Sequence, residues 1–390
     1  MIMIIIIFDK VKNMLLHSPR ESSVKEISKR LSIKGFKVYS VAAVIAIASS
    51  ITACTVTVTK PTATTTTVAT TTAATTPAKT ESLPLVVATN SVACALAKQI
   101  AGYTIDLKCL IEAGTDPHLY QPKPDDRKAI DSAKLVLYGG YDFEPGLIKL
   151  IQASSNSAPK IAVNEVAVPS PLMSEDGHSH DHSHEKAEKK DAKSEKSDKK
   201  DAKEVDPHVW NNAQNGIKIT QSISKSLSML RPDQAETYAK NTAKIISELE
   251  QIDVWIKAQI ATIPEASRKL VTTHDALGYY AQAYGIPVEG ALNGISTEEQ
   301  PTPTRVKELV EVITASKVPT IFAEVSINPK LITTVAKEAN VKVSERELYA
   351  DGLGAKGSEA ETFAGMLIVN TRTIVEGLGG KYTPFQLKTP

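Results

Sequence analysis

The fold is constrained most by short apolar runs that alternate with stretches of helical periodicity from residue 83 onward. Runs such as 83–89 and 134–138 are rich in Leu and Val, the composition of buried strands. Strands that alternate with helices in this way indicate an α/β fold, in which helices cover both faces of a parallel sheet. In this first set, strands are expected at 83–89, 105–111, 134–138 and 160–163, and helices at 91–101, 124–133 and 143–153.

A single long helix separates this set from a second one. Apolar side chains recur every three or four positions from Ile245 to Ile260, as on an amphipathic helix. A helix over 233–263 would be roughly 45 Å long, more than the width of one small lobe. We therefore expect two parallel-sheet lobes, at 83–232 and 266–384, joined by a rigid helix at 233–265. Further helices are expected at 213–230, 276–284, 306–316, 329–339 and 359–378, and further strands at 269–273 and 320–325.

The N-terminal region has the pattern of an export signal. Basic residues precede an apolar run at 38–51, which is shorter than the roughly 20 residues that span a bilayer. The sequence Ile-Thr-Ala-Cys that ends at Cys54 resembles a bacterial-type lipobox, in which the cysteine is lipidated and becomes the first mature residue. We interpret 1–53 as a signal peptide, with an uncleaved signal anchor as the alternative, and the Thr-rich 54–82 as a tether. The folded part would then lie outside the cytoplasm, anchored to the cell membrane by the lipid.

The charge of the chain gives no reason to expect nucleic-acid binding, and the cysteine content leaves open whether a disulfide forms. The net charge is +1, and because basic residues concentrate before Cys54, the remainder is mildly acidic. Such a chain gives no reason to expect nucleic-acid binding. Cys94 and Cys109 either form a disulfide outside the cytoplasm or are two small buried apolar residues. We expect the folded part to be a monomer.

A charged insertion interrupts the first lobe at 174–205. It begins with alternating histidines and continues as a Lys/Glu/Asp run with almost no large apolar residue. Because such a composition cannot form a core, we predict a disordered segment. Its histidines form a candidate auxiliary metal site, at His178, His180, His182 and His184.

Three other histidines lie at the ends of predicted strands or in the loops that follow them. His118 and His208 each end an Asp-Pro-His triplet, in which the proline stiffens the loop and Asp116 or Asp206 is placed to orient a neighbouring group. His274 follows the first predicted strand of the second lobe. Ligands of open α/β sheets bind outside the carboxyl ends of the strands, which is where these imidazoles are expected.

Asp351 completes a candidate donor set. It lies in a Gly-flanked loop, LYADGLG, late in the second lobe. Three neutral imidazoles and one carboxylate are ligands that tetrahedral zinc accepts, at bond lengths of roughly 2.0–2.2 Å. A single histidine in a loop is more often structural than a ligand, so the pattern alone leaves the two interpretations balanced.

Five motifs, in this order, resemble the solute-binding lipoproteins of zinc and manganese ABC importers: GTDPHLYQPKPDD, DPHVW, TTHDALGYYAQAYG, IFAEVSINPKL and LYADGLGAKGSEAETFAGM. The resemblance implies two (βα) lobes joined by one long helix, with the metal between the lobes and two ligands from each. Carried over by motif, the ligands are His118, His208, His274 and Asp351. The implied function is to capture a metal ion outside the cytoplasm and deliver it to an ABC importer permease with its ATPase.

The residue at position 274 bears on the choice of metal. The family has His or Glu at this position, and Glu accompanies manganese-type members. His274 makes the site nitrogen-rich, which suits zinc better than manganese, so we expect Zn(II), with Mn(II) as the alternative. The His-rich insertion is also typical of zinc-type members. By motif, Glu324 is expected to hold His274 or a loop, and direct ligation in competition with Asp351 is the alternative.

Two other functions compete with metal transport. A zinc hydrolase needs an open coordination position and a general base, whereas four protein ligands would close the site, and the sequence has no HExxH motif. A surface adhesin is the second competitor, because relatives have that role, but no feature of the sequence marks an adhesive surface. We therefore expect a metal carrier that is not an enzyme.

Overall fold

The computed structural model describes residues 82–173 and 204–388. Within these ranges, no helix combines the length and the apolar character that crossing a membrane requires. Several predictions lie outside the described residues: the signal peptide 1–53, lipidation at Cys54, the tether 54–82 except for its last residue, and the insertion 174–205 except for its last two residues, with His178, His180, His182 and His184.

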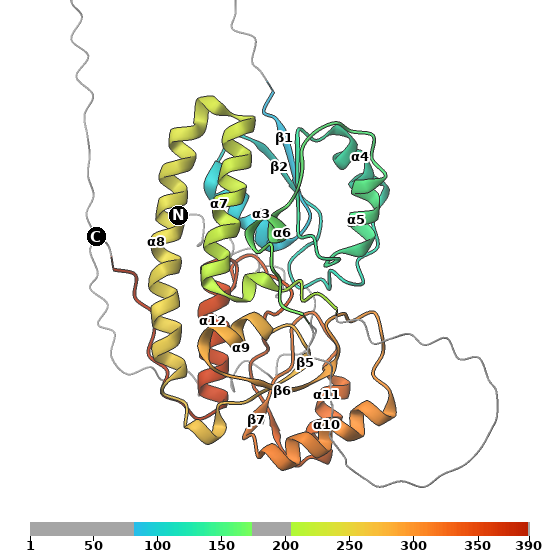
Figure 1. Cartoon of the computed structure of the whole chain (residues 1–390), viewed down its shortest axis with the longest axis vertical. Coiled ribbons are helices and arrows are strands. Elements are labelled where there is room, and N and C mark those ends of the chain that lie inside the picture. The colour runs from blue at the N-terminus through green and yellow to red at the C-terminus, as the bar shows by residue number, and fades with distance from the viewer. Residues whose placement is uncertain (1–81, 174–203, 389–390) are drawn as a thin grey trace, which may run out of the picture. The chain divides into compact units, whose positions relative to one another are not determined.

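A four-stranded parallel sheet forms the centre of the first lobe (Figure 1). The strand order β2-β1-β3-β4 places the first strand of the lobe inside the sheet. This lobe therefore has the parallel α/β architecture that the sequence predicts. Its strands are β1 (Leu85–Ala88), β2 (Asp106–Cys109), β3 (Leu135–Tyr138) and β4 (Lys160–Ala162), and its helices are α3 (Ser91–Ala101), α4 (Pro124–Ser132), α5 (Pro145–Gln152) and α6 (Val163–Ala167).

Successive residues of these strands enter different cores. Val86 and Leu137 belong to a large core that includes α3, whereas Val87 and Val136 belong to a smaller core that includes α4 and α5. Because neighbouring side chains of a strand point to opposite faces, a sheet covered on both sides requires continuous apolar runs. The sequences LVVA of β1 and LVLY of β3 are such runs.

The long helix of the chain is α8 (Ala235–Ile260), which lies beside α7 (Ala213–Leu230) in Figure 1. It begins two residues later than predicted, because a short 3-10 turn at Pro232–Gln234 precedes it. Its 26 residues make it about 39 Å long. It contacts α3 of the first lobe and also α9 (Gly278–Tyr284) and α12 (Phe363–Gly377) of the second, so it packs against both lobes.

The second lobe contains two pairs of parallel strands. β5 (Leu270–His274) pairs in parallel with β6 (Val288–Asn293), and β7 (Thr320–Ile321) pairs in parallel with β8 (Lys342–Val343). The backbone N–H of Phe322 donates to the carbonyl of Val271 at 2.9 Å and joins the two pairs. β5 thus lies between β6 and β7, although each pair forms its own two-stranded sheet. The lobe also contains the short 3-10 turn Glu265–Ser267, α10 (Pro303–Ser316) and α11 (Lys330–Glu338).

The element boundaries differ from the sequence expectations mainly where capping residues decide them. α10 begins at Pro303 rather than at 306, because the side chain of Thr302 accepts from the backbone N–H of Arg305 and Pro303 occupies the first turn. α12 begins at Phe363 rather than at 359, where Thr362 caps it in the same way. β7 ends at Ile321, and the rest of the strand predicted at 320–325 contributes only an isolated bridge between Glu324 and Leu348.

A disulfide between Cys94 and Cys109 ties α3 to the end of β2. The sequence left open whether these cysteines pair, and the structure decides in favour of pairing. β2 leads directly into the loop that carries His118, so the bond fixes the start of that loop to the neighbouring helix.

Removing this disulfide is expected to lower the free energy of unfolding by about 3 kcal/mol, the entropic value for a closed loop of about 15 residues. The change is the double substitution Cys94→Ala and Cys109→Ala, measured by urea unfolding of the metal-free protein. A reductant should destabilise the wild type to the same extent and leave the double variant unaffected. Equal unfolding midpoints for both proteins without reductant would contradict the expectation.

Candidate metal centre

Four buried side chains converge from four separate segments. His118 lies in the loop after β2, and His208 directly precedes the 3-10 turn Val209–Asn211. His274 is the last residue of β5, and Asp351 lies in the loop after β8. None of the four is more than 4% exposed. Two come from the first lobe and two from the second, and the structure brings together the four residues that the sequence singled out.

Several distances between their facing atoms are close to those of a tetrahedral donor set, and all lie within 4.8 Å. Nε2 of His118 lies 3.2 Å from Nε2 of His208, and Nε2 of His274 lies 3.0 Å from Oδ1 of Asp351. The same Oδ1 lies 3.4 Å from Nε2 of His208 and 3.8 Å from Nε2 of His118. Donors bonded to tetrahedral zinc at 2.0–2.2 Å would lie about 3.3–3.6 Å apart. A first-row divalent cation therefore fits this set once the widest of these distances, at most 4.8 Å, contracts toward the tetrahedral value.

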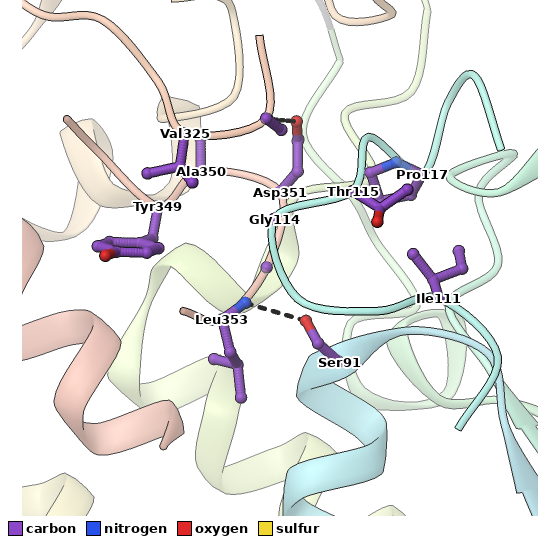
Figure 2. Close-up of a pocket in the computed structure, with 12 residues that line it drawn as sticks. Ser91, Ile111, Gly114, Thr115, Pro117, Val325, Tyr349, Ala350, Asp351 and Leu353 are labelled. Atoms are coloured by element: carbon purple, nitrogen blue, oxygen red, sulfur yellow. Dashed lines mark hydrogen bonds between the residues drawn. The ribbon is translucent and has the colours of Figure 1, made fainter. Parts of the chain in front are cut away.

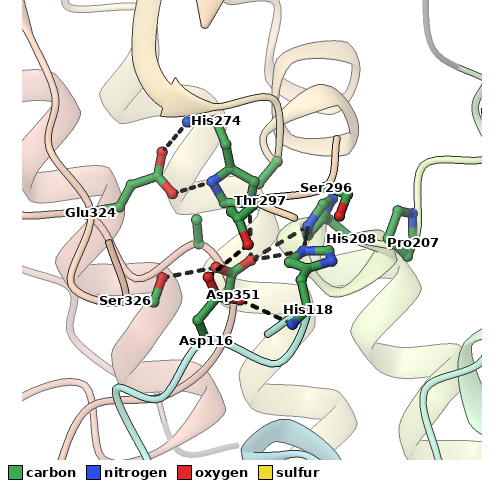
Figure 3. A network of polar contacts seen from close by, with 12 residues as sticks. Asp116, His118, Pro207, His208, His274, Ser296, Thr297, Glu324, Ser326 and Asp351 are labelled. Atoms are coloured by element: carbon green, nitrogen blue, oxygen red, sulfur yellow. Dashed lines mark hydrogen bonds and ion pairs between the residues drawn. The ribbon is translucent and has the colours of Figure 1, made fainter. Parts of the chain in front are cut away.

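The ring of His274 is held by Glu324 (Figure 3). Nδ1 of His274 lies 2.5 Å from Oε2 of Glu324, while Oε1 accepts the backbone N–H groups of Thr273 and His274, each at 2.9 Å. Both oxygens of this carboxylate are thus engaged away from the donor cluster. The contact directs Nε2 of His274 toward Asp351, as expected of a carboxylate that orients a neighbouring imidazole.

Asp206 holds the ring of His208 in the same manner. Its Oδ1 lies 2.8 Å from Nδ1 of His208 and also accepts the backbone N–H of His208 at 2.9 Å. The following residues tie this segment to the second lobe, because Trp210 Nε1 and Asn211 Nδ2 both donate to the carbonyl of Ala350 at 3.1 Å. The Asp-Pro-His segment therefore fixes both its own imidazole and the loop that carries Asp351.

The first Asp-Pro-His triplet behaves differently. Oδ1 of Asp116 accepts the backbone N–H of His118 at 2.9 Å, and its Oδ2 accepts the hydroxyl of Thr297 from the second lobe at 2.7 Å. Among the described residues, no hydrogen bond reaches Nδ1 of His118. Its ring instead meets the edge of Phe143, with centroids 5.3 Å apart. Asp116 thus fixes the loop and links the two lobes, and it leaves the imidazole of His118 without a carboxylate partner.

Two polar side chains in this network were not identified from the sequence. The hydroxyl of Ser326 donates to Oδ2 of Asp351 at 2.8 Å, which leaves Oδ1 directed at the three histidines. Ser326 stands two residues after Glu324 inside the IFAEVSINPKL motif, so the motif offered a signal for it. Thr297 lies in a loop without a distinctive pattern, and only the fold shows its contact with Asp116.

Burial and neighbouring charges shift the pKa of all four residues of the cluster. Burial lowers the pKa of His274, but the charges of Asp351 and Glu324 outweigh it and raise that pKa well above the ordinary value. Burial would raise the pKa of Asp351, but the charge of His274 and the hydrogen bond from His208 hold it well below its usual range. The pKa of His208 is raised, because its hydrogen bonds to Asp206 and Asp351 outweigh burial. For His118, burial dominates and lowers the pKa to about 3.

A buried set of three imidazoles and one carboxylate, held between two parallel α/β lobes that share a long helix, defines a class: two-lobed metal-binding proteins. A family profile described as zinc-uptake complex component A, periplasmic, matches residues 86–377. The chain belongs to this family.

Similar proteins agree with this assignment. The chain is 33% identical over 299 residues to the metal ABC transporter substrate-binding lipoprotein SsaB of Streptococcus sanguinis, covering 75% of this chain and 88% of that protein. It is also 33% identical, with the same coverage, to the manganese ABC transporter substrate-binding lipoprotein PsaA of Streptococcus pneumoniae. Among solved structures, the periplasmic zinc-binding protein TroA from Treponema pallidum aligns with a TM-score of 0.66 at 29% identity, over 76% of this chain and 99% of that one.

These findings confirm the coarse functional prediction. The chain is a metal-binding, substrate-binding component of an ABC importer. Its family consists of solute-binding proteins, so the prediction that it is not an enzyme is also confirmed.

Proposed function

We propose that this chain captures Zn(II) outside the cytoplasm and delivers it to the permease of an ABC importer. The ligands in this proposal are His118, His208, His274 and Asp351. The observation that carries it is the buried cluster of one ligand atom from each residue, all within 4.8 Å of one another. Tetrahedral zinc is satisfied by four such nitrogen and oxygen donors.

The orientation of the carboxylates favours zinc over manganese. Oδ2 of Asp351 is engaged by Ser326, and both oxygens of Glu324 are engaged by the segment at His274, so one oxygen, Oδ1 of Asp351, faces the three nitrogens. Manganese prefers more oxygen ligands and stands lowest in the divalent affinity order. It is the second candidate, because relatives carry manganese in their names.

We further propose that a lipid holds the chain at the membrane outside the cytoplasm. In this proposal, residues 1–53 are removed as a signal peptide, lipid on Cys54 anchors the chain, and 54–82 act as the tether of a monomer. The names of relatives as lipoproteins support the anchor. His178, His180, His182 and His184 are proposed as a weaker auxiliary site. No observation favours the adhesin alternative.

Metal content tests the proposal directly. Protein purified without an affinity tag and without added metal is expected to contain zinc rather than manganese, at one tightly bound ion per chain, measured by mass spectrometry of the elements. A matched variant that lacks 174–204 should keep this ion and lose only weaker binding, because the four proposed ligands lie outside the deletion. Manganese in the native protein, or loss of the tight ion from the variant, would contradict the proposal.

Zinc affinity is expected to fall as the pH falls from 8 toward 5.5. Zinc requires neutral imidazoles, whereas the raised pKa values of His274 and His208 let these rings hold protons to higher pH than a free imidazole does. Binding must therefore release protons, and each released proton changes the affinity by about tenfold per pH unit. Calorimetry in buffers of different ionisation enthalpy should show more than one proton released per zinc at pH 7. An affinity that stays constant down to pH 5.5 would contradict this.

A further inference from the structure

Two clefts adjoin the donor cluster, and they differ greatly in size. The cleft on the Asp351 side is lined by Ser91, Gly114, Thr115 and other residues drawn in Figure 2. Its volume is about 10 Å³, which is room for about one water molecule. A hydrated divalent cation does not fit into this space.

The cavity on the other side has a volume of about 400 Å³ and is lined by residues of both lobes. His118 is the one candidate ligand that lines it, together with Asp142 and Glu204 of the first lobe and Ser296 and Glu298 of the second. In Figure 3, Ser296 and Pro207 stand on the side of His118 and His208, opposite Glu324 and Ser326. This cavity has room for a cation with its water shell, and His118 of the donor cluster forms part of its wall.

The lining of this cavity is acidic. Three of its described lining residues are carboxylates, and none of the lining residues within 82–173 and 204–388 is Lys or Arg. Partial burial, followed by the charges of Glu299 and Asp142, raises the pKa of Glu204, which indicates that these carboxylates are close enough to interact. A cleft lined by charges of one sign concentrates the electric field and raises the local concentration of counter-ions.

His118 is the candidate ligand that the surrounding protein holds least firmly. The rings of His208 and His274 are each fixed by a carboxylate at Nδ1, whereas no hydrogen bond within the described residues reaches Nδ1 of His118. The side chain of His118 is nevertheless only 2% exposed. His118 thus combines the weakest local support of the candidate ligands with a position in the wall of the acidic cavity, which suits the first contact with an incoming cation.

We propose that the cavity beside His118 is the route by which the metal ion reaches and leaves the site, and that its carboxylates attract the ion. This inference rests on the proposed metal-binding function and adds to it the path of the ion. The narrow cleft on the Asp351 side has no such role.

The first test measures how fast zinc associates. Stopped-flow competition of the full chain with a zinc indicator dye gives the association and dissociation rate constants. The double variant Asp142→Asn, Glu298→Gln should associate at least about threefold more slowly at 10 mM salt. This difference should vanish at 0.5 M salt, where screening is strong. The exposed control Glu265→Gln should match the wild type. An association rate constant equal to that of the wild type, or a decrease that is the same at both salt concentrations, would contradict the proposal that the carboxylates attract the ion.

The second test obstructs each cleft in turn. Ser296→Trp should slow association and dissociation by the same factor and leave the equilibrium affinity within twofold, because an obstacle on a path does not change its end points. Thr115→Trp, in the narrow cleft, should leave both rates unchanged. Slower exchange in Thr115→Trp, or unchanged rates in Ser296→Trp, would overturn the route. If the proposed function itself were wrong, the wild type would not bind zinc tightly, and this result is distinct from a change in rates.

Discussion

Replacing His274 by alanine is expected to weaken zinc binding by a factor of several hundred. Zinc bound by four protein ligands is stabilised by about 10–16 kcal/mol, or about 2.5–4 kcal/mol per ligand, and the middle of this range corresponds to that factor. The substitution also leaves Glu324, which is 1% exposed, facing a cavity without its imidazole partner. Competition titration against a chelator of known affinity measures the loss.

The matched comparison is Glu324→Gln, which keeps the shape of the side chain and removes its charge. The amide can still accept the backbone N–H groups of Thr273 and His274, but it no longer stabilises the orientation of the His274 ring as a carboxylate does. Loss of such a supporting group costs about 10–100-fold in metal affinity. A larger loss in Glu324→Gln than in His274→Ala would show that Glu324 is itself a ligand.

The wild-type site is expected to prefer zinc over manganese by at least about a thousandfold, as nitrogen-rich donors and the divalent affinity order dictate. His274→Glu should narrow this preference, because it removes a nitrogen and adds a carboxylate. The structure adds a complication: the new carboxylate would lie against Glu324, and two buried carboxylates in contact cannot both be ionised at low cost.

The sharper variant is therefore the pair His274→Glu, Glu324→Gln, in which the amide can donate to the new carboxylate. This pair should bind manganese more tightly than His274→Glu alone, while zinc binding remains weaker than in the wild type. Competition titrations with zinc and manganese, under the same conditions for the wild type, the single variant and the double variant, measure the metal preference of each protein. A wild type that prefers manganese would contradict the assignment of His274 as the residue that sets the metal preference.

The four ligand candidates were assigned from the sequence through the motifs of the family that it resembles, because the local patterns alone, two Asp-Pro-His triplets and a histidine after a predicted strand, left the interpretation balanced. The local sequence could not distinguish the role of Asp116 from that of Asp206, because both residues begin an Asp-Pro-His triplet. Asp206 reaches the ring of its own histidine, whereas Asp116 is drawn to Thr297, a residue 181 positions away in the sequence. Local pattern determines that a carboxylate is present, and tertiary contacts determine what it binds.

In the fold, too, local sequence patterns predicted some elements, and others depend on tertiary contacts. The buried strands β1 and β3 and the helix α8 were predictable, because long apolar or periodic runs identify them. β6 was missed, since VEGALN has neither alternation nor a continuous apolar run, and Gly290 lies in its middle. β8 has only two residues and carries too little pattern. Pairing of the cysteines depends on the distance between α3 and β2, which spacing in the sequence does not determine.

The largest core has a consequence for how the molecule loses its structure. It contains Val86 and Leu137 of the first lobe, Leu249 and Ile252 of α8, and Phe322 of the second lobe in one contiguous cluster. Neither lobe can be exposed to water without opening the apolar surface of the other, so heating should melt both in a single cooperative transition. A ligand that binds between the two lobes, and only to the native state, raises the melting temperature of this single transition. The melting temperature reported by a spectroscopic probe anywhere in the described part of the chain should therefore show whether a ligand is bound between the lobes.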